Sequence, residues 1–194
     1  MPELNVASDF TVNPQTGLIQ PARLCLSPNR DERPANATVD AIILHGISLP
    51  PGEFGGGEIE ALFLNNLDWD AHPYFAEIRG MQVSAHLLVR RDGELVQFVP
   101  FNERAWHAGE SAFRGQTRCN DFSLGIELEG EDEISYDDRQ YTVLSAVLEA
   151  LFAAYPALSA RELAGHCDVA PGRKSDPGPA FDWLRLYDAL GKSL

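Results

Sequence analysis

A segment near the C-terminal end carries three side chains that could take part in metal-assisted hydrolysis. His166 is followed ten positions later by Asp176, and Lys174 lies two residues before that carboxylate. The prolines and glycines of residues 165–179 prevent a helix or a central strand from running through the segment. Imidazole and carboxylate are good zinc ligands, and an ammonium group beside a metal-bound water is suited to hydrolysis. On these residues alone, a hydrolytic site and a solvated turn both stay open.

A third candidate ligand ends a short apolar run earlier in the chain. Residues 41–44 are apolar without alternation, as expected of a strand that is buried on both faces. His45 follows where this strand gives way to a loop, the position at which open α/β sheets usually place functional groups. A histidine there can also be a packing or capping residue. With His166 and Asp176 it would complete a set of two imidazoles and one carboxylate, leaving the fourth tetrahedral position for water.

Five ordered motifs carry a resemblance to a known family. They are LHGISLPPGEFGGG, VSAHLLVRRDGELVQFVPF, RAWHAGES, CNDFSLGIELEG and GHCDVAPGRKSDPGPAFDW. Through them the chain resembles the AmpD-type 1,6-anhydro-N-acetylmuramyl-L-alanine amidases. These belong to the zinc amidase superfamily, which includes T7-type lysozyme and the peptidoglycan recognition proteins. The resemblance extends from about residue 23 to about residue 187, which is nearly the whole chain.

The resemblance implies a role for each candidate residue. It implies that zinc is bound by His45, His166 and Asp176. It also implies that Glu127 and Lys174 act on the reacting water and the amide. One departure is visible, because the residue after the first zinc-binding histidine is commonly asparagine in this family and is Gly46 here. That asparagine contacts the substrate peptide. Gly46 has no side chain for the contact, but it leaves the metal set intact.

Glu127 and Lys174 are the residues whose chemistry suits proton transfer and charge stabilisation. In the predicted strand 123–129, Glu127 and Glu129 alternate with apolar residues and therefore share one face. A carboxylate near a zinc-bound water can accept its proton and pass it to the leaving amine, although a solvated strand face is the other interpretation. Lys174 could stabilise the oxyanion formed when water attacks the amide, or be a surface lysine. Glu129 is the fallback acid.

Three further residues are candidates for substrate binding. Trp106 and His107 lie in a predicted loop, and an indole ring can stack on the C–H face of a sugar or belong to the core. We expect His107 to face substrate or to be structural, since a fourth protein ligand would close the metal site. By the resemblance, Arg118 matches a position that binds a carboxylate of the stem peptide, and a guanidinium fork suits that geometry.

The elements that must position these residues alternate between strands and helices. Apolar periodicity and turn residues predict strands at 39–45, 83–91, 95–99 and 123–129, and helices at 58–65, 137–155 and 181–190. This order indicates an α/β fold in one domain, with a mixed central β-sheet flanked by helices, as in the zinc amidases that the chain resembles. Residues 1–35 are predicted to form an irregular leader packed on a catalytic domain at 36–194.

The amino-acid composition limits the kinds of binding partner and the cellular location that we expect. A net charge of −14 would repel nucleic-acid phosphates and anionic membrane surfaces, so we expect neither partner. Three cysteines, an odd and sparse set, indicate reduced thiols rather than a disulfide framework. The first residues lack the basic head and apolar core of a secretory signal. The sequence therefore predicts a cytoplasmic monomer.

Two other classes of function are weaker. A peptidoglycan-binding module would have lost a metal ligand, whereas all three candidate ligands are present here. A glycosidase that uses Glu127 and Glu129 fails because residues i and i+2 of a strand point the same way and cannot flank a scissile bond. The resemblance implies a zinc-dependent N-acetylmuramoyl-L-alanine amidase. Its substrate would be small 1,6-anhydro-muropeptides, cut at the lactyl–L-Ala amide during cytoplasmic cell-wall recycling.

Overall fold

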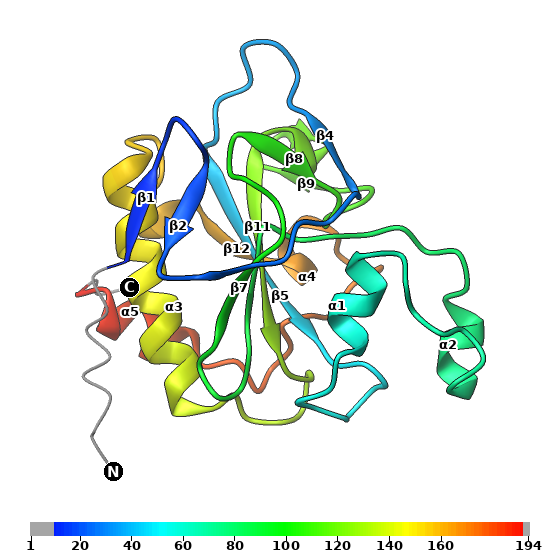
Figure 1. The fold of residues 1–194 in the computed structure, drawn as a ribbon. Helices are drawn as coiled ribbons and strands as arrows, with labels where there is room; N and C mark the ends of the chain where they lie inside the picture. The colour runs from blue at the N-terminus through cyan, green and yellow to red at the C-terminus, as the bar shows by residue number, and fades with distance from the viewer. Residues whose placement is uncertain (1–9, 192–194) are drawn as a thin grey trace.

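A six-stranded sheet runs through the centre of the computed structural model, which describes residues 10–191 (Figure 1). From one edge to the other its strands are β12 (Leu163–Gly165), β5 (Ala41–Ile47), β11 (Ser123–Glu129), β6 (Leu87–Val89), β7 (Leu95–Gln97) and β3 (Arg23–Leu24). Neighbouring strands are parallel except β6 and β7, which form an antiparallel hairpin. The predicted α/β architecture with a mixed sheet is confirmed.

The two central strands place two candidate residues side by side. β11 is buried along its whole length, and β5 is buried from Ala41 to His45. A parallel strand covered on both faces is typically a nearly continuous apolar run, as β5 is, whereas β11 alternates leucine and isoleucine with small and acidic residues. In the parallel register between the strands, Glu127 is the partner of His45. Both side chains therefore lie near the carboxyl ends of their strands.

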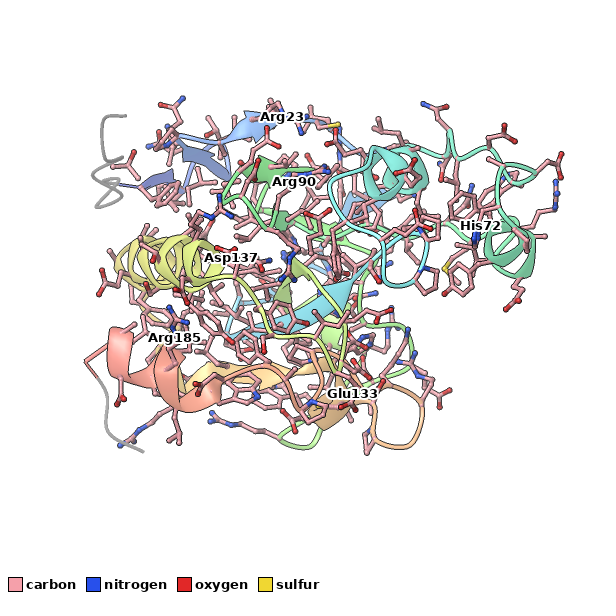
Figure 2. All side chains as sticks on the ribbon, turned by 90° about the horizontal axis from the view of Figure 1, so that it is seen from below. Arg23, His72, Arg90, Glu133, Asp137 and Arg185 are labelled. Carbon is pink, nitrogen blue, oxygen red and sulfur yellow. The ribbon has the colours of Figure 1, made fainter. Side chains whose placement is uncertain are left out.

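One side of the sheet is covered by α3 (Asp138–Ala154) and α5 (Trp183–Ala189) (Figure 1). The apolar stripe of α3 is fully buried at Leu144, Val147, Leu148 and Leu151. The helix begins at the N-cap Asp137, labelled in Figure 2, which forms a reciprocal capping box with Gln140. The periodic stripe and the cap together explain why this helix could be predicted almost to the residue.

The other side of the molecule carries short helices (Figure 1). They are α1 (Glu58–Phe63), α2 (Pro73–Glu77) and α4 (His166–Val169). Leu62 and Phe63 of α1 belong to a second apolar cluster with Leu88 and Phe98. The sequence did not predict α2 or α4, because one helical turn is too short to show a hydrophobic period.

The segment predicted to be an irregular leader contains short strands between residues 10 and 35. Three two-stranded ribbons occur in the described chain: β1 (Thr11–Asn13) with β2 (Leu18–Gln20), β4 (Arg30–Glu32) with β8 (Glu103–Ala105), and β9 (Ala112–Phe113) with β10 (Gln116–Thr117). Strands of two or three residues show no alternation from which to predict them. Two of these ribbons are local hairpins, whereas β4 pairs with backbone about 70 residues later in the chain. Residues 1–9 of the predicted leader lie outside the described residues.

Two 3-10 helices, at Cys119–Asp121 and Ala160–Glu162, complete the elements of residues 10–191. Across this part of the chain, every helix is too short or too polar to span a lipid bilayer.

Candidate active site

A cavity of about 450 Å³ opens at the carboxyl ends of β5 and β11. Its polar wall contains the five residues predicted to bind metal or to act in catalysis, which are His45, Glu127, His166, Lys174 and Asp176. Its apolar wall includes Leu49, Leu62, Phe63, Tyr74, Ile78 and Val83. The cavity thus combines a set of ionisable groups with a surface able to hold the apolar parts of a ligand.

Three ligand atoms lie within hydrogen-bonding distance of one another. His45 Nδ1 is 3.0 Å from His166 Nδ1 and 3.3 Å from Asp176 Oδ2. His166 Nδ1 is 3.1 Å from the same carboxylate oxygen. Zinc bonds of about 2.0–2.1 Å in a tetrahedral site imply about 3.3–3.4 Å between ligand atoms. The triangle therefore fits one face of a tetrahedral metal site.

The loop between two of these ligands is closed by its own backbone. His166 begins the single helical turn α4, and Pro171 follows soon after that turn ends at Val169. The amide of Cys167 then donates to the carbonyl of Asp176 at 2.9 Å. This bond returns the chain to its starting point, so that residues ten positions apart meet.

The proton on the His166 ring is assigned by a neighbouring carbonyl. His166 Nε2 lies 3.2 Å from the carbonyl oxygen of Ala108, which can only accept a hydrogen bond. Nε2 therefore carries the proton of the neutral ring. Nδ1 keeps its lone pair and directs it toward Asp176.

A longer chain of hydrogen bonds assigns the proton on His45. Ser123 Oγ donates to the carbonyl of Cys119 at 2.6 Å, so it accepts from His107 Nε2 at 3.3 Å. His107 Nδ1 is then an acceptor for His45 Nε2–H at 2.9 Å. His45 Nδ1 is left unprotonated, and burial lowers the pKa of His45 to about 4, which keeps the ring neutral. Two lone pairs and a carboxylate facing one another are the donor set of a cation site.

Glu127 is buried beside this cluster without a partner for one of its oxygens. Its exposed fraction is 8 %, and Oε2 has no hydrogen-bond partner among residues 10–191. Burial raises the pKa of Glu127 well above its usual range, the charge of Asp176 raises it further, and Lys174 opposes the shift. A raised pKa makes a carboxyl group a better proton acceptor, which suits it to acid–base catalysis.

The second acid of the strand has a different environment. Glu129 is 2 % exposed and accepts hydrogen bonds from the amides of Gly55 at 2.6 Å and Arg91 at 3.0 Å. Arg90 lies 3.6 Å from the same carboxylate. Glu129 does not line the cavity, so it holds structure around the site.

The three predicted substrate-binding residues are not gathered at one place. His107 lines the cavity, but it packs behind His45 and against Gly125, where a Cβ would lie 2.4 Å from the imidazole ring. Trp106 is not among the residues that line the cavity. Arg118 is exposed, pairs with Asp121 at 3.1 Å and borders a separate cavity. Their assignment as substrate contacts stays a prediction.

Two supporting residues were missed by the sequence analysis. Ser123 completes the hydrogen-bond chain behind His45, as described above. Asn120 Oδ1 accepts hydrogen bonds from the backbone amides of His107 at 3.2 Å and Ala108 at 2.8 Å. It thereby fixes the backbone of the two residues that orient the rings of His45 and His166. Both lie in or beside the predicted loop before strand 123–129, where short polar residues are common and carry no signal of their own.

Comparison with known proteins identifies one family of relatives, the N-acetylmuramoyl-L-alanine amidases. The sequence profile described as N-acetylmuramoyl-L-alanine amidase matches residues 35–179. The 1,6-anhydro-N-acetylmuramyl-L-alanine amidase AmpD of Escherichia coli (strain K12) is 57 % identical over 178 residues, covering 92 % of this chain and 97 % of that protein.

The solved structures to which this chain is similar include amidases of the same kind. The crystal structure of a selenomethionine derivative of AmpD is similar with a TM-score of 0.89 and 53 % identity, covering 92 % of this chain and 98 % of that one. The amidase AmiD from Escherichia coli, solved with anhydro-N-acetylmuramic acid-L-Ala-D-gamma-Glu-L-Lys, is 29 % identical with a TM-score of 0.57. That alignment covers 84 % of this chain and 62 % of the AmiD chain.

Proposed function

The chain belongs to the N-acetylmuramoyl-L-alanine amidase family, and from this premise we propose that it hydrolyses the lactyl–L-Ala amide of 1,6-anhydro-muropeptides. The substrate class is supported by the 57 % identity to a relative that bears this activity in its name. The observation that carries the proposal is the cluster of His45, His166 and Asp176 beside an unpaired Glu127. This arrangement suits the attack of water on an amide.

The donor set fits zinc. His45 and His166 would bind through Nδ1, and Asp176 through Oδ2, since these atoms face one another and both imidazoles carry their protons on Nε2. When bound there, the ion would act as a Lewis acid and lower the pKa of a coordinated water. Hydrogen bonds to Ala108 and His107 hold the two rings in the binding tautomer.

Glu127 and Lys174 carry out the proton and charge steps. Glu127 accepts the proton of the attacking water and delivers it to the leaving amine, a transfer helped by its raised pKa. Lys174 lines the same cavity, and its ammonium group stabilises the negative charge that develops on the amide oxygen. The remote Arg118 would engage a stem carboxylate, and Trp106 with His107 the sugar, only through rearrangement around the bound substrate.

The cellular setting is part of the same proposal. The enzyme acts as a monomer in the cytoplasm on small muropeptides during cell-wall recycling, without nucleic-acid or membrane partners. The net charge of −14 and the three free cysteines support this setting. The catalytic domain covers residues 36–194 and the leader residues 1–35, a division supported by the start of the family match at residue 35.

The test is hydrolysis of purified 1,6-anhydro-muropeptide, followed by mass spectrometry of the products. We expect a free stem peptide and anhydro-N-acetylmuramic acid, loss of activity on chelation, and recovery with Zn²⁺. Elemental analysis should find one zinc per chain in the native protein and none in a His166→Ala, Asp176→Ala double variant. Activity that survives chelation, or zinc retained by the double variant, would overturn the proposed centre.

A second measurement tests the substrate class. We expect the anhydro-muropeptide to be cut more efficiently than its ring-opened reducing form, and both more efficiently than purified sacculi. Equal kcat/KM on all three would contradict the recycling role, although the amidase chemistry would stand.

A further inference from the structure

Tyr136 is a buried residue whose hydroxyl group lies against the ligand-bearing segments. It precedes the N-cap of α3 and is 5 % exposed. We propose that Tyr136 is a positioning residue that holds Asp176 in the ligand cluster, and that residue 46 is glycine because the Tyr136 hydroxyl occupies the space of a side chain there. This inference rests on the proposed function.

The hydroxyl group fixes the backbone directly after the carboxylate ligand. Tyr136 Oη donates to the carbonyl of Pro177 at 2.9 Å. On the other side of the ligand, the carbonyl of Asp176 accepts from Cys167 at 2.9 Å. The two consecutive carbonyls are thus held by different elements, one by the helical turn that bears His166 and the other by Tyr136.

The glycine at position 46 is explained by space. A Cβ atom there would lie 2.3 Å from Tyr136 Oη, which is far inside van der Waals contact. Gly46 does not have a positive φ angle, so its backbone would accept other residues. The hydroxyl group, rather than the backbone conformation, is therefore what leaves no room for a side chain at position 46 in this packing.

The ring of Tyr136 is closely packed against two neighbours. A Cβ atom at Gly130 would lie 2.3 Å from Tyr136 Cε1, which shows how closely the ring approaches that backbone. The ring of Phe181 also packs edge-on against the Tyr136 ring, with 5.4 Å between the ring centroids. A side chain at position 46 would therefore displace the hydroxyl group from Pro177 and disturb the ligand segment.

The hydroxyl group remains a donor throughout the working pH range. Burial raises the pKa of Tyr136 above its usual value, and the nearby charges of Glu127, Asp132 and Asp176 raise it further. A neutral phenol keeps the proton that the Pro177 carbonyl accepts.

Single and double substitutions test this arrangement. The variants are Tyr136→Phe, Gly46→Ala and the two combined, with Tyr141→Phe as the control. Tyr141 is also buried and stacks on Phe181 at 5.4 Å, but its hydroxyl accepts from the amide of Asp182, away from the ligands. Zinc affinity is measured by competition with a chromophoric chelator, and ligand geometry by the visible spectrum of the Co²⁺-substituted protein.

We expect Tyr136→Phe to fold and to lose about 10- to 100-fold in zinc affinity, as is usual when a support of a metal ligand is removed. Its Co²⁺ spectrum should change. Gly46→Ala should lose affinity similarly, while the double variant should be no worse than Tyr136→Phe. The reason is that the new Cβ would lie 3.6 Å from the ring carbon Cζ once the oxygen is gone, which is an ordinary contact.

Several outcomes would overturn the proposal. Wild-type zinc affinity and spectrum in Tyr136→Phe would do so, as would losses that add in the double variant, or an equal loss in Tyr141→Phe. If Tyr136→Phe does not fold, Gly46→Ala decides alone, and unchanged affinity there refutes the inference. A wild-type protein that binds no zinc would contradict the proposed metal centre itself, which is a different result from any of these.

Discussion

Glu127 and Glu129 lie two residues apart on one face of β11, and both are buried, yet their surroundings differ in kind. Glu127 lines the cavity, and its Oε2 has no partner in the described chain. Glu129 accepts two backbone hydrogen bonds and lies 3.6 Å from a guanidinium group. Burial is common to both carboxylates, so the two differ in the hydrogen-bond donors that surround them. An unpaired carboxylate is free to interact with a ligand, whereas one whose acceptors are satisfied holds its neighbours in place.

The satisfied carboxylate belongs to a network that fixes the rim of the cavity. Glu129 binds the amide of Gly55, and Arg90 donates to the carbonyl of Gly56. Arg90 also reaches Glu60 of α1 at 3.0 Å, and Glu60 pairs with Arg23 at 2.6 Å. Figure 2 shows the side chains of Arg23 and Arg90 on the same side of the molecule. One strand thus supplies both the cavity-lining Glu127 and an anchor for the loop beside it.

The largest effect that sharpens this comparison is expected for Glu127→Gln. The amide cannot accept a proton, so turnover should fall at least about a hundredfold while zinc and substrate binding persist. Steady-state kinetics and elemental analysis measure the two properties. Near-normal turnover with zinc retained would transfer the proton shuttle to another residue.

Lys174→Ala should cause a loss of similar or slightly smaller size. Removing one donor that stabilises an oxyanion costs about 3–4 kcal/mol in a dry site, and the exposure of Lys174 to water reduces that value. We expect the loss in kcat rather than in KM. A rise in KM with unchanged kcat would show that Lys174 only binds the substrate.

Glu129→Gln should affect stability more than catalysis. The amide nitrogen would replace an acceptor facing the N–H groups of Gly55 and Arg91, and an unsatisfied buried group costs about 1–3 kcal/mol. Urea unfolding should show this loss, and hydrogen exchange should become faster in residues 48–57. A kcat as low as that of Glu127→Gln would break the comparison between the two acids.

The smallest effect concerns the pH dependence of stability in the zinc-free protein. The pKa of Glu127 is raised in the folded state, so its contribution to stability is full below the unfolded pKa of about 4.3 and is lost as pH rises through the folded pKa. Glu127→Gln should therefore become more stable than wild type as pH rises. The pKa of His45 is lowered to about 4, so His45 also makes stability depend on pH. Because both proteins contain His45, its contribution cancels in the difference between their stabilities.

Thermal unfolding of both proteins between pH 4 and pH 8 would measure this difference. A constant gap across the range would show that Glu127 is not titrating with a raised pKa in the folded state.

Local patterns were sufficient to predict several features. Residues 123–129 alternate as a strand, and the apolar period with its terminal proline indicated a helix close to Asp138–Ala154. His45 was predicted to end its strand because the apolar run stops there, but β5 continues to Ile47, so His45 lies two residues before the strand end. These predictions succeed because hydrophobic period, turn residues and strand ends are properties of consecutive residues. Their roles as ligands came from the family resemblance and stay a proposal.

Other features depended on residues far apart in the chain. Alternation places Glu127 and Glu129 on the same face and cannot distinguish them, because the donors that satisfy Glu129 come from residues 55 and 91. The lone pair of His45 is directed by Ser123 through His107, a connection that no spacing reveals.

Residue 46 also shows the difference between what the sequence determines and what packing decides. The sequence by itself determined that a glycine stands after His45, which could be interpreted only as the loss of a family contact. Only the tertiary structure decided that a tyrosine 90 residues later fills that space. The physical reason is that local sequence sets the conformation and polarity of each segment. Which donors, charges and atoms meet there is set by packing between segments, and those contacts leave one buried carboxylate oxygen without a partner in the described part of the chain and satisfy another carboxylate.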